Sequence, residues 1–366
     1  MKVVVTGTRG IPDVLGGVET HCQELYPLLV ERGHDVTLIR RTSYCHTPAS
    51  EAYKGVSLYD IDVPKTKSLE AISHTFKAIL AARFTFRADV IHIHAIGPAL
   101  LTPFARLLGM KVVFTHHGPD YDRDKWGTLA KLVLRTGEAM GALFAQEVIV
   151  ISEVINTTLK EKYRRKDAHL IYNGVPKPER IATHTYLDSL GVEPQKYVFA
   201  MGRFVPEKNF HQLIEAFKPL ATQGYKLVLA GDNLIEDAYS AQLKQQALDH
   251  GVVLTGFIKG APLQELLSHA RLFVLPSSHE GLPIALLEAM SYQLPVVVSD
   301  IPANVAVGLP AEHYFPLNQI AAMTSCMEQQ LQQQKARISY DMQAYDWSLI
   351  AQQVERVYSR LLTNAK

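Results

Sequence analysis

The chain has 366 residues, more than one hydrophobic core usually supports, so two domains are expected. Hydrophobic residues make up 47% of it and charged residues 20%, as is typical of globular proteins, and the net charge of +1 argues against a general nucleic-acid binder. Its three cysteines lack metal-ligand spacing, the chain begins with an apolar run instead of a secretory leader, and no apolar run reaches the roughly 20 residues of a membrane span, so we expect a cytoplasmic protein without such a span.

Short apolar runs alternate with glycine-rich turns and helical patterns in the first half of the chain. The run at 2–6 leads into a glycine-rich turn, a helical pattern over 18–31 follows, and a second run begins at residue 35. This order opens a Rossmann-type domain of parallel strands. Further strands are predicted at 89–94, 111–118, 147–152 and 169–172, and a proline-spaced linker follows them up to residue 178.

The same plan restarts in the second half. Strands with their turns are predicted at 197–201, 226–232, 252–257, 271–276 and 295–302. The last helix, over about 347–362, has an apolar face made of Trp347, Ile350, Val354, Val357 and Leu361. We therefore expect a first domain at 1–175 that also includes the C-terminal helix at about 345–366, and a second domain at 176–344.

A basic amphipathic helix is predicted within 64–87. Its cations are Lys65, Lys67, Lys77, Arg83 and Arg87, and its apolar residues are Leu69, Ile72, Phe76, Ile79 and Leu80. One interpretation is a domain-surface helix whose apolar face lies in the core. The second is a helix that contacts anionic lipid.

Histidines end two of the predicted strands, at His92 and His94 and at His116 and His117. Two histidines two residues apart reflect the alternation of a strand, and no acidic ligand stands at a suitable offset, so we expect no metal site. Ligands of open α/β sheets bind beyond the carboxyl ends of the strands, which makes His117 and Gly118 candidates for function.

A nicotinamide-dependent oxidoreductase is one competing interpretation. Gly7-x-x-Gly10 resembles the start of a dinucleotide fingerprint, Arg40-Arg41 is a candidate for the 2′-phosphate of NADP, and Tyr121-x3-Lys125 resembles a dehydrogenase pair. Against this interpretation, Asp13 replaces the third glycine of the fingerprint, and Tyr121 lies in a predicted loop.

The most informative stretch is 277–290, a polar loop that joins an apolar strand to a helix. Glu280 lies in the loop, Gly281 removes a side chain beside it, and Pro283 suits the first helical position. Glu288 lies more than a turn inside the helix. A helix N-terminus favours phosphate, and carboxylates accept hydrogen bonds from sugar hydroxyls, so the stretch predicts a site for a phosphate group that is accompanied by a sugar.

Glu280-x7-Glu288, embedded in Ser-x-x-Glu-Gly-Leu-Pro and Leu-Glu-Ala-Met, resembles the nucleotide-sugar motif of glycosyltransferase family 4, a group of retaining enzymes. The resemblance implies the GT-B fold, in which two Rossmann-like domains face a cleft and the last helix returns to the first domain. Residues 118–126, together with Thr-Arg-Gly-Ile-Pro at 8–12, resemble a bacterial polysaccharide-biosynthesis subgroup that includes rhamnosyl, galactosyl and mannosyl transferases.

The resemblance also implies residue roles. Arg203 and Lys208 neutralise the diphosphate, Glu280 holds the donor sugar and Glu288 holds the ribose. His117 lies beside the donor sugar, with His116 as its competitor for that role. Further nucleotide-sugar contacts are implied for Gly16, Gly17, Gly256, Phe257, Gly281 and Leu282, and acceptor-side contacts for His94, Asp120, Tyr121 and Arg123.

The expected function is retaining transfer of a hexose or deoxyhexose from a nucleoside-diphosphate sugar to a saccharide acceptor, which the resemblance suggests is lipid-linked. No metal, other cofactor or nucleic acid is expected to take part. The protein is expected to be cytoplasmic, with peripheral contact to anionic lipid at the inner face of the plasma membrane. A nucleotide-sugar epimerase and a non-catalytic nucleotide-sugar sensor also compete with this interpretation.

Overall fold

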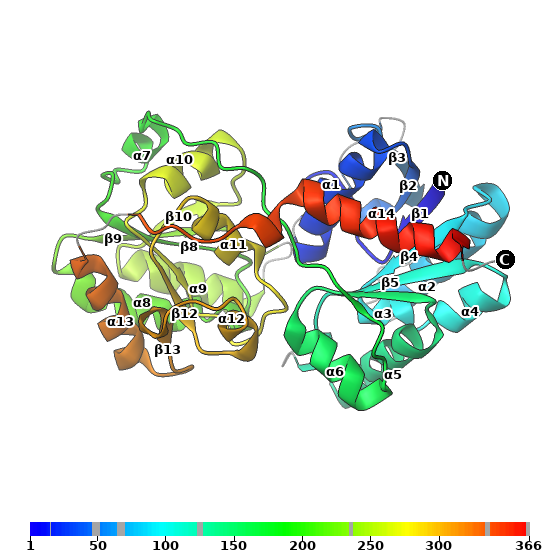
Figure 1. The fold of residues 1–366 in the computed structure, drawn as a ribbon. Coiled ribbons are helices and arrows are strands. Elements are labelled where there is room, and N and C mark those ends of the chain that lie inside the picture. Colours follow the sequence, from blue (N-terminus) through cyan, green and yellow to red (C-terminus); the bar gives the residue numbers. More distant parts are fainter. Residues whose placement is uncertain are drawn as a thin grey trace. The chain divides into compact units, whose positions relative to one another are not determined.

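The computed structural model describes residues 1–14, 16–45, 52–63, 70–122, 127–233, 237–333 and 337–363. The chain divides into two compact units. Unit 1 comprises Met1–Gly174 together with Ala344–Lys366, and unit 2 comprises Val175–Gln343. Each unit is built around one parallel sheet with helices packed against it (Figure 1). This is the arrangement of two Rossmann-like domains that the recurring strand pattern predicts.

The sheet of unit 1 has seven parallel strands in the order β3-β2-β1-β4-β5-β6-β7. These are β1 (Lys2–Thr6), β2 (Asp35–Arg41), β3 (Ser57–Ile61), β4 (Val90–His94), β5 (Lys111–His116), β6 (Glu147–Val150) and β7 (His169–Leu170). The central strands β1, β4 and β5 are almost entirely buried. Their apolar runs are continuous because helices cover both faces of a parallel sheet.

The helices of unit 1 include the C-terminal one. They are α1 (Gly17–Glu31), α2 (Glu70–Leu80), α3 (Ile96–Ala99), α4 (Thr102–Leu107), α5 (Thr128–Phe144), α6 (Glu153–Tyr163) and α14 (Trp347–Thr363). Short η helices lie at Thr42–Tyr44, Ala81–Thr85 and Asp120–Asp122. Helix α14 runs beside α1 (Figure 1). All five residues of its predicted apolar face are buried in the core of unit 1, which confirms that face.

The sheet of unit 2 has six parallel strands in the order β10-β9-β8-β11-β12-β13. These are β8 (Tyr197–Met201), β9 (Lys226–Ala230), β10 (Val253–Gly256), β11 (Leu272–Leu275), β12 (Val296–Ser299) and β13 (Tyr314–Phe315). Its helices are α7 (Thr185–Ser189), α8 (Phe210–Ala221), α9 (Ala238–Asp249), α10 (Ala261–His269), α11 (Ile284–Ser291), α12 (Pro302–Val305) and α13 (Ile320–Gln332). The η helices Pro206–Lys208, Ala311–His313 and Gln343–Tyr345 complete the elements of this part of the chain.

The basic helix predicted within 64–87 is α2, which the η helix Ala81–Thr85 extends; Lys65, Lys67 and Leu69 lie outside the described residues. Its buried side includes Ala78 and Ile79, but Phe76 is 43% exposed. The expectation that Phe76 joins the core is wrong, because it lies on the outer side of α2 and stacks on Phe104 of α4, with 5.0 Å between ring centroids. No helix in the described ranges is long and apolar enough to span a bilayer.

Each sheet has a topological switch point. On one side of this point successive strands are added towards one edge of the sheet, and on the other side towards the opposite edge. In unit 1 this switch lies between β1 and β4, and in unit 2 between β8 and β11. Loops that leave neighbouring strands there diverge and leave a crevice at the carboxyl ends, where ligands of open α/β sheets bind. The predicted site residues fall largely in these loops.

Candidate functional site

In unit 2, the loops after β8 and β11 bring Lys208 and Glu280 into contact. The Nζ of Lys208 donates a hydrogen bond to Oε1 of Glu280, and the two groups form an ion pair. Only 16% of the Lys208 side chain and 11% of the Glu280 side chain are exposed. The two strands are neighbours in the sheet, with Phe199 opposite Phe273. A cation and a carboxylate thus share the switch point of this sheet.

Backbone contacts fix the two loops to each other. Ser278 donates its N–H to the carbonyl oxygen of Glu207 at 2.9 Å, and the side-chain amide of Asn209 donates to the carbonyl oxygen of Pro276 at 3.1 Å. Asn209 is buried and adopts the left-handed conformation, with φ 52°, that asparagine tolerates better than most residues. These contacts hold the backbone on both sides of the Lys208–Glu280 pair.

The second acid of the motif, Glu288, lies half-buried in α11. Gly281 is half-buried and Leu282 is buried in the turn before this helix. The sequence places Pro283 at the first helical position, but its ψ of 115° is extended, so it is the N-cap and the helix begins at Ile284. The helix N-terminus therefore begins directly after the loop that carries Glu280.

The remaining unit 2 candidates follow β8 and β10, which lie on either side of β9 in the sheet. Arg203 is half-buried in the loop after β8, on the same loop as Lys208. Gly256 ends β10 with φ 67°, and Phe257 after it is 48% exposed. Because all strands are parallel, these residues lie at the same carboxyl edge as Glu280.

In unit 1, the glycine-rich loop after β1 is held by its own contacts. A Cβ atom on Gly7 would lie 2.1 Å from the carbonyl oxygen of His94, so this glycine serves the close approach of the loop to β4. Gly16 has φ 152°, and a Cβ atom there would lie 2.0 Å from Oε2 of Glu19. The buried Glu19 accepts the N–H of Arg9 at 3.0 Å. The loop thus packs back on the start of α1, while a Cβ atom on Gly17 would meet nothing within 4 Å.

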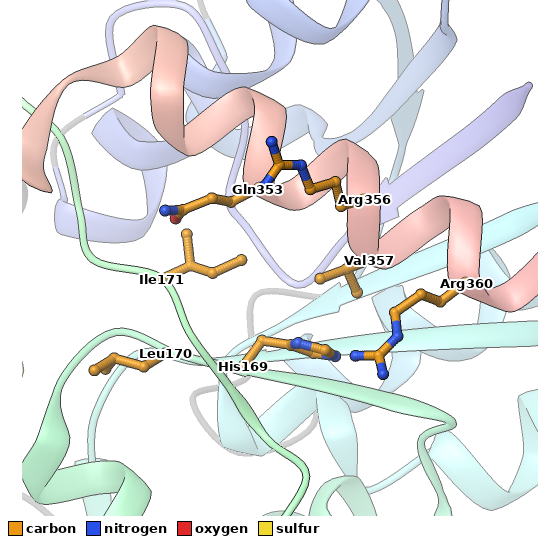
Figure 2. Close-up of a pocket in the computed structure, with 7 residues that line it drawn as sticks. All are labelled: His169, Leu170, Ile171, Gln353, Arg356, Val357 and Arg360. Carbon is orange, nitrogen blue, oxygen red and sulfur yellow. The ribbon is translucent and has the colours of Figure 1, made fainter.

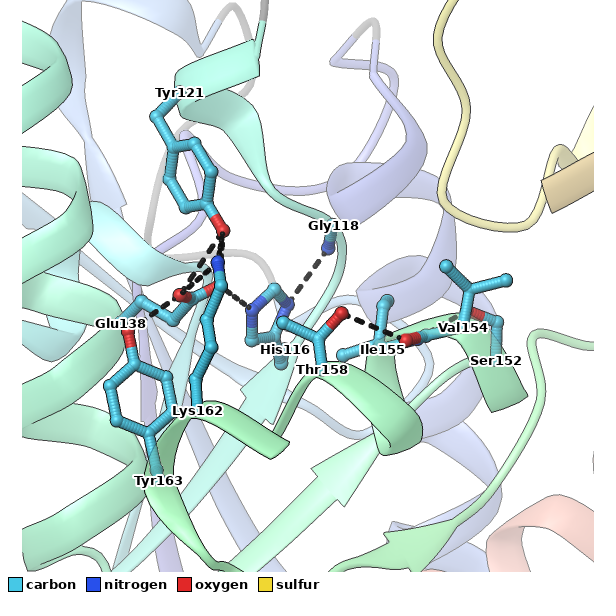
Figure 3. Close-up of polar contacts among 10 residues, drawn as sticks. All are labelled: His116, Gly118, Tyr121, Glu138, Ser152, Val154, Ile155, Thr158, Lys162 and Tyr163. Carbon is cyan, nitrogen blue, oxygen red and sulfur yellow. Dashed lines mark hydrogen bonds and ion pairs between the residues drawn. The ribbon is translucent and has the colours of Figure 1, made fainter. Parts of the chain in front are cut away.

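A buried carboxylate organises the loop after β5 (Figure 3). Oε1 of Glu138 on α5 lies 2.8 Å from Nε2 of His116, and its Oε2 accepts the hydroxyl of Tyr163 at 2.7 Å. The hydroxyl of Tyr121 donates to the same carboxylate at 3.0 Å, and Lys162 donates to that hydroxyl at 2.8 Å. Nδ1 of His116 accepts the N–H of Gly118 at 3.1 Å. Both ring nitrogens of His116 are therefore engaged inside unit 1.

These contacts also determine the charge of Glu138. Burial alone would raise the pKa of its carboxyl group, but the hydrogen bonds from His116 and Tyr163 and the charge of Lys162 together lower that pKa. Burial and the neighbouring carboxylate raise the pKa of the Tyr121 hydroxyl. The network is thus a carboxylate that neutral hydroxyl groups and a cation stabilise.

His117, by contrast, is half-buried and faces two other histidines. Its Nε2 lies 2.8 Å from Nδ1 of His94, and its ring centroid lies 4.9 Å from that of His21. The ring nitrogens of His21, His94 and His117 lie within 4.8 Å of one another, a spacing compatible with a metal ion. The histidines at the strand ends predict no such cluster, because its third member, His21, lies on α1.

The acceptor-side candidates lie in different environments. His94 is fully buried, Tyr121 is 4% exposed with its hydroxyl engaged by Glu138, and Asp120 is half-buried. Arg123 lies outside the described residues. Their contact with an acceptor stays a prediction.

The arginines that an oxidoreductase would require are engaged inside unit 1. Arg40 is fully buried and pairs with Asp60, with 2.7 Å between Nε and Oδ1. Nη1 of Arg41 lies 3.5 Å from Oε1 of Glu70. Both arginines are buried and each pairs with a carboxylate of unit 1, which does not favour a role in binding the 2′-phosphate of NADP. Lys125 of the Tyr-x3-Lys pair lies outside the described residues.

One pocket of about 330 Å³ lies in unit 1 between β7 and α14. Figure 2 shows its lining, which is His169, Leu170, Ile171, Gln353, Arg356, Val357 and Arg360. The residues that line it include none of the predicted site residues. It is therefore distinct from the predicted site.

The sequence does not predict a role for Glu138 or His21 in these networks. Glu138 lies on α5 and His21 on α1, and His21 also contacts Asn173, which is 152 positions away in the chain. No local spacing marks such contacts, because they depend on how a helix packs on the sheet.

Two protein-family models match the chain. The model "Glycosyltransferase Family 4" covers residues 15–177 and the model "Glycosyl transferases group 1" covers residues 186–346. Among similar proteins, an α-1,3-galactosyltransferase of Escherichia coli, named for UDP-Gal and α-D-GlcNAc-diphosphoundecaprenol, is 28% identical over 83% of this chain and 81% of its own length. The amylovoran biosynthesis glycosyltransferase AmsD of Erwinia amylovora is 24% identical over 78% of this chain and 77% of its own length.

Two solved structures show the same fold. Sucrose-phosphate synthase of Thermosynechococcus elongatus superposes with a TM-score of 0.85 over 100% of both chains, at 18% identity. Anabaena HepE, solved in complex with UDP and glucose, superposes with a TM-score of 0.77 over 98% of this chain and 99% of its own, at 20% identity. Two matching family models, relatives in polysaccharide biosynthesis and a shared two-domain fold together show that this chain is a GT-B glycosyltransferase and belongs to glycosyltransferase family 4.

Proposed function

We propose that this glycosyltransferase moves a hexose or deoxyhexose from a nucleoside-diphosphate sugar to a saccharide acceptor during cell-surface polysaccharide biosynthesis. The observation that carries the proposal is the Lys208–Glu280 pair at the switch point of unit 2. A nucleoside-diphosphate sugar brings an anion and hydroxyl donors to one place. A cation and a carboxylate side by side match both groups.

In this proposal, Arg203 and Lys208 stabilise the negative charge that develops on the leaving diphosphate. Each such interaction is typically worth about 3 kcal/mol in the transition state. Glu280 accepts hydrogen bonds from the donor sugar, Glu288 accepts them from the ribose, and Gly256 and Phe257 contact the base. The amides near Leu282 complete the part of the diphosphate site that unit 2 supplies, and contacts of Gly16 and Gly17 with the donor stay a prediction for unit 1.

Lys208 changes partner when the donor binds. Without donor, its ammonium group is paired with Glu280. The diphosphate then competes for the ammonium, and the sugar hydroxyls replace it at the carboxylate. The pair thus keeps both groups compensated until the substrate supplies better partners, which limits the cost of holding charges in a half-buried site.

We also propose that transfer retains the anomeric configuration. It needs no metal ion in this proposal, because Arg203 and Lys208 neutralise the charge of the diphosphate. His117 contacts the donor sugar in this scheme. It suits that part better than His116, since Glu138 and the Gly118 N–H engage both nitrogens of His116. NMR of the product fixes its configuration, and turnover unchanged by a chelator tests metal independence.

The acceptor is proposed to be lipid-linked, in line with the diphosphoundecaprenol in the name of the galactosyltransferase relative. Such an acceptor brings the enzyme to a membrane. Unit 1 exposes cations on and just after α2, at Lys77, Arg83 and Arg87, beside Phe84, which is 65% exposed. Cations with an exposed aromatic ring suit contact with anionic lipid.

Vesicle co-sedimentation tests the membrane contact. Wild-type protein is expected to sediment with vesicles that contain phosphatidylglycerol, and the Lys77→Glu, Arg83→Glu, Arg87→Glu triple variant is expected to stay in solution. The matched control reverses three exposed cations of unit 2, Lys218, Lys226 and Lys259. Equal sedimentation of the two triple variants would contradict the proposed surface.

Thermal-shift screening against UDP, GDP, dTDP and ADP, followed by their sugars, tests the donor site. A ligand that binds only the folded protein raises the melting temperature. At a ligand concentration of 100 times the dissociation constant, the free energy of unfolding rises by about 2.7 kcal/mol. One nucleoside diphosphate is expected to stabilise the protein, and Arg203→Ala and Glu288→Ala are expected to abolish the shift. Arg180→Ala, an exposed arginine of the same unit, should keep it. No shift with any of the four ligands would count against the proposal.

A further inference from the structure

The three histidines that meet in unit 1 come from three separate elements. His21 lies on α1, His94 ends β4 and His117 follows β5. The ring centroids of His94 and His117 are 5.1 Å apart, and those of His21 and His94 are 5.6 Å apart. Because one nitrogen of each ring lies within 4.8 Å of the other two, the rings converge on a common centre.

The contact of His21 with Asn173 sets which nitrogen of His21 carries the lone pair. Oδ1 of Asn173 lies 2.9 Å from Nδ1 of His21. An amide oxygen only accepts hydrogen bonds, so Nδ1 carries the proton and Nε2 carries the lone pair. An oxygen that holds the far nitrogen of an imidazole is the arrangement found behind metal-binding histidines, where it fixes the tautomer and the ring orientation.

A second layer of hydroxyl groups supports His94. Its Nε2 lies 2.5 Å from the hydroxyl of Tyr26, which also lies 3.0 Å from Nδ1 of His92. The same nitrogen of His92 lies 2.6 Å from the hydroxyl of Tyr358. A tyrosine hydroxyl both donates and accepts hydrogen bonds. When Nδ1 of His94 becomes a ligand, the proton of this ring lies on Nε2, and the hydroxyl of Tyr26 can accept a hydrogen bond from it.

Without an ion, His94 and His117 share one proton across 2.8 Å. Nitrogens around a tetrahedral zinc ion are about 3.3 Å apart, since each Zn–N bond is about 2.0–2.1 Å. The proton between Nδ1 of His94 and Nε2 of His117 must therefore move away, and the two rings must separate by roughly 0.5 Å. Half-buried His117 lies on the more exposed side of the cluster, where His21 and His94 are buried.

We infer that His21, His94 and His117 form a binding site for a zinc-type divalent ion, with Asn173 and Tyr26 as its supporting hydrogen-bond partners. Three neutral imidazoles suit zinc, cobalt, nickel and copper, and they are poor ligands for magnesium, which prefers oxygen. Three protein ligands leave the fourth tetrahedral position open to water or another oxygen ligand. The inference concerns metal binding in unit 1 and gives the ion no part in sugar transfer. Since His117 is also the residue proposed to contact the donor sugar, a bound ion would compete with that contact.

Spectroscopy of the full chain tests the site without any sugar substrate. Protein stripped with a chelator and then freed of it is titrated with Co²⁺, whose four-coordinate complexes absorb visible light strongly, and Zn²⁺ is then added as competitor. One equivalent of Co²⁺ is expected to bind and to be displaced by one equivalent of Zn²⁺, while Mg²⁺ displaces none. Absence of a saturable one-to-one signal would overturn the inference.

Variants show whether the signal comes from this cluster. His21→Ala is expected to remove the cobalt absorption, and Asn173→Ala to weaken zinc binding by about 10- to 100-fold, as loss of a supporting partner typically does. His250→Ala, which removes an exposed histidine of unit 2, should bind like the wild type. If circular dichroism shows that His21→Ala does not fold, His21→Gln replaces it. Wild-type affinity in a folded His21 variant would overturn the assignment.

Discussion

The ammonium group of Lys208 and the carboxylate of Glu280 form a half-buried ion pair, although 72 positions separate them in the chain. The pair exists because β8 and β11 are neighbours in the sheet, and the loops after them meet. In the proposed donor site the two members of the pair have different roles. Lys208 would neutralise the diphosphate of the donor, and Glu280 would accept hydrogen bonds from its sugar hydroxyl groups.

Glu280→Gln should therefore separate donor binding from turnover. Glutamine keeps the shape of the side chain but frees Lys208 from its counter-charge, so the nucleoside diphosphate is expected to bind at least as tightly as in the wild type. Loss of charged hydrogen bonds to the sugar should lower turnover by about 10- to 100-fold. Calorimetry with the nucleoside diphosphate and steady-state kinetics measure the two effects. Glu215→Gln, which breaks an exposed ion pair with Lys218, is the control. Weaker nucleotide binding in Glu280→Gln would contradict this division of roles.

Arg203→Ala should lower turnover by about 10²-fold or more, because a donor that stabilises developing charge is typically worth that much in rate. The melting temperature without ligand should change little, since the side chain lies in a loop and is only half-buried. Single-turnover kinetics measures the first effect and calorimetric melting the second. Near-wild-type turnover would remove Arg203 from the proposed site.

His74 makes the stability of unit 1 depend on pH. Burial, and then the charge of Arg41, lower the pKa of His74 to about 4. The unfolded chain binds a proton near pH 6.5 and the folded chain does not, so this contribution is complete above pH 6.5 and is lost as the pH falls towards 4. Between pH 7 and pH 5, the free energy of unfolding should fall by about 2 kcal/mol on account of this residue.

Urea unfolding at pH 7 and pH 5 measures how much His74 contributes to the pH dependence of the free energy of unfolding. Both tryptophans, Trp126 and Trp347, belong to unit 1, so their fluorescence reports the unfolding of that unit. The fall in the free energy of unfolding between pH 7 and pH 5 should be about 2 kcal/mol smaller in His74→Leu than in the wild type. In His250→Leu it should be unchanged. An identical pH dependence in both variants would show that His74 is not responsible.

Gly174→Ala should destabilise unit 1 by about 1–3 kcal/mol, the usual cost of overpacking. A Cβ atom on Gly174 would lie 2.5 Å from Cδ2 of the buried Trp347, a rigid ring that cannot turn aside easily. Gly97→Ala is the matched control, because its Cβ would meet only an ordinary contact at 3.5 Å and alanine suits a helix. Urea unfolding followed by tryptophan fluorescence measures both. Equal stabilities would mean that the turn relaxes around the added methyl group.

Local patterns predicted most strands and the terminal helix. The apolar runs at 2–6 and 197–201 coincide with β1 and β8, and the apolar face of α14 is buried as its spacing predicts. Strands β3 and β13 were missed, because β3 is half-exposed at an edge and β13 has two residues. Phe76 was misplaced, since an apolar residue of α2 packs on Phe104 outside the core.

Apolar periodicity and short motifs were enough to predict the two-domain plan, the family and the nucleotide-sugar candidates, because the residues that carry these signals are close in the chain. Which side chains meet depends instead on how distant elements pack. The pairing of His116 with Glu138 and the convergence of His21, His94 and His117 require α5 and α1 to lie on one sheet. No local spacing in the sequence indicates how distant elements pack. Only the tertiary structure, in which the helices pack on the strands, therefore shows these contacts.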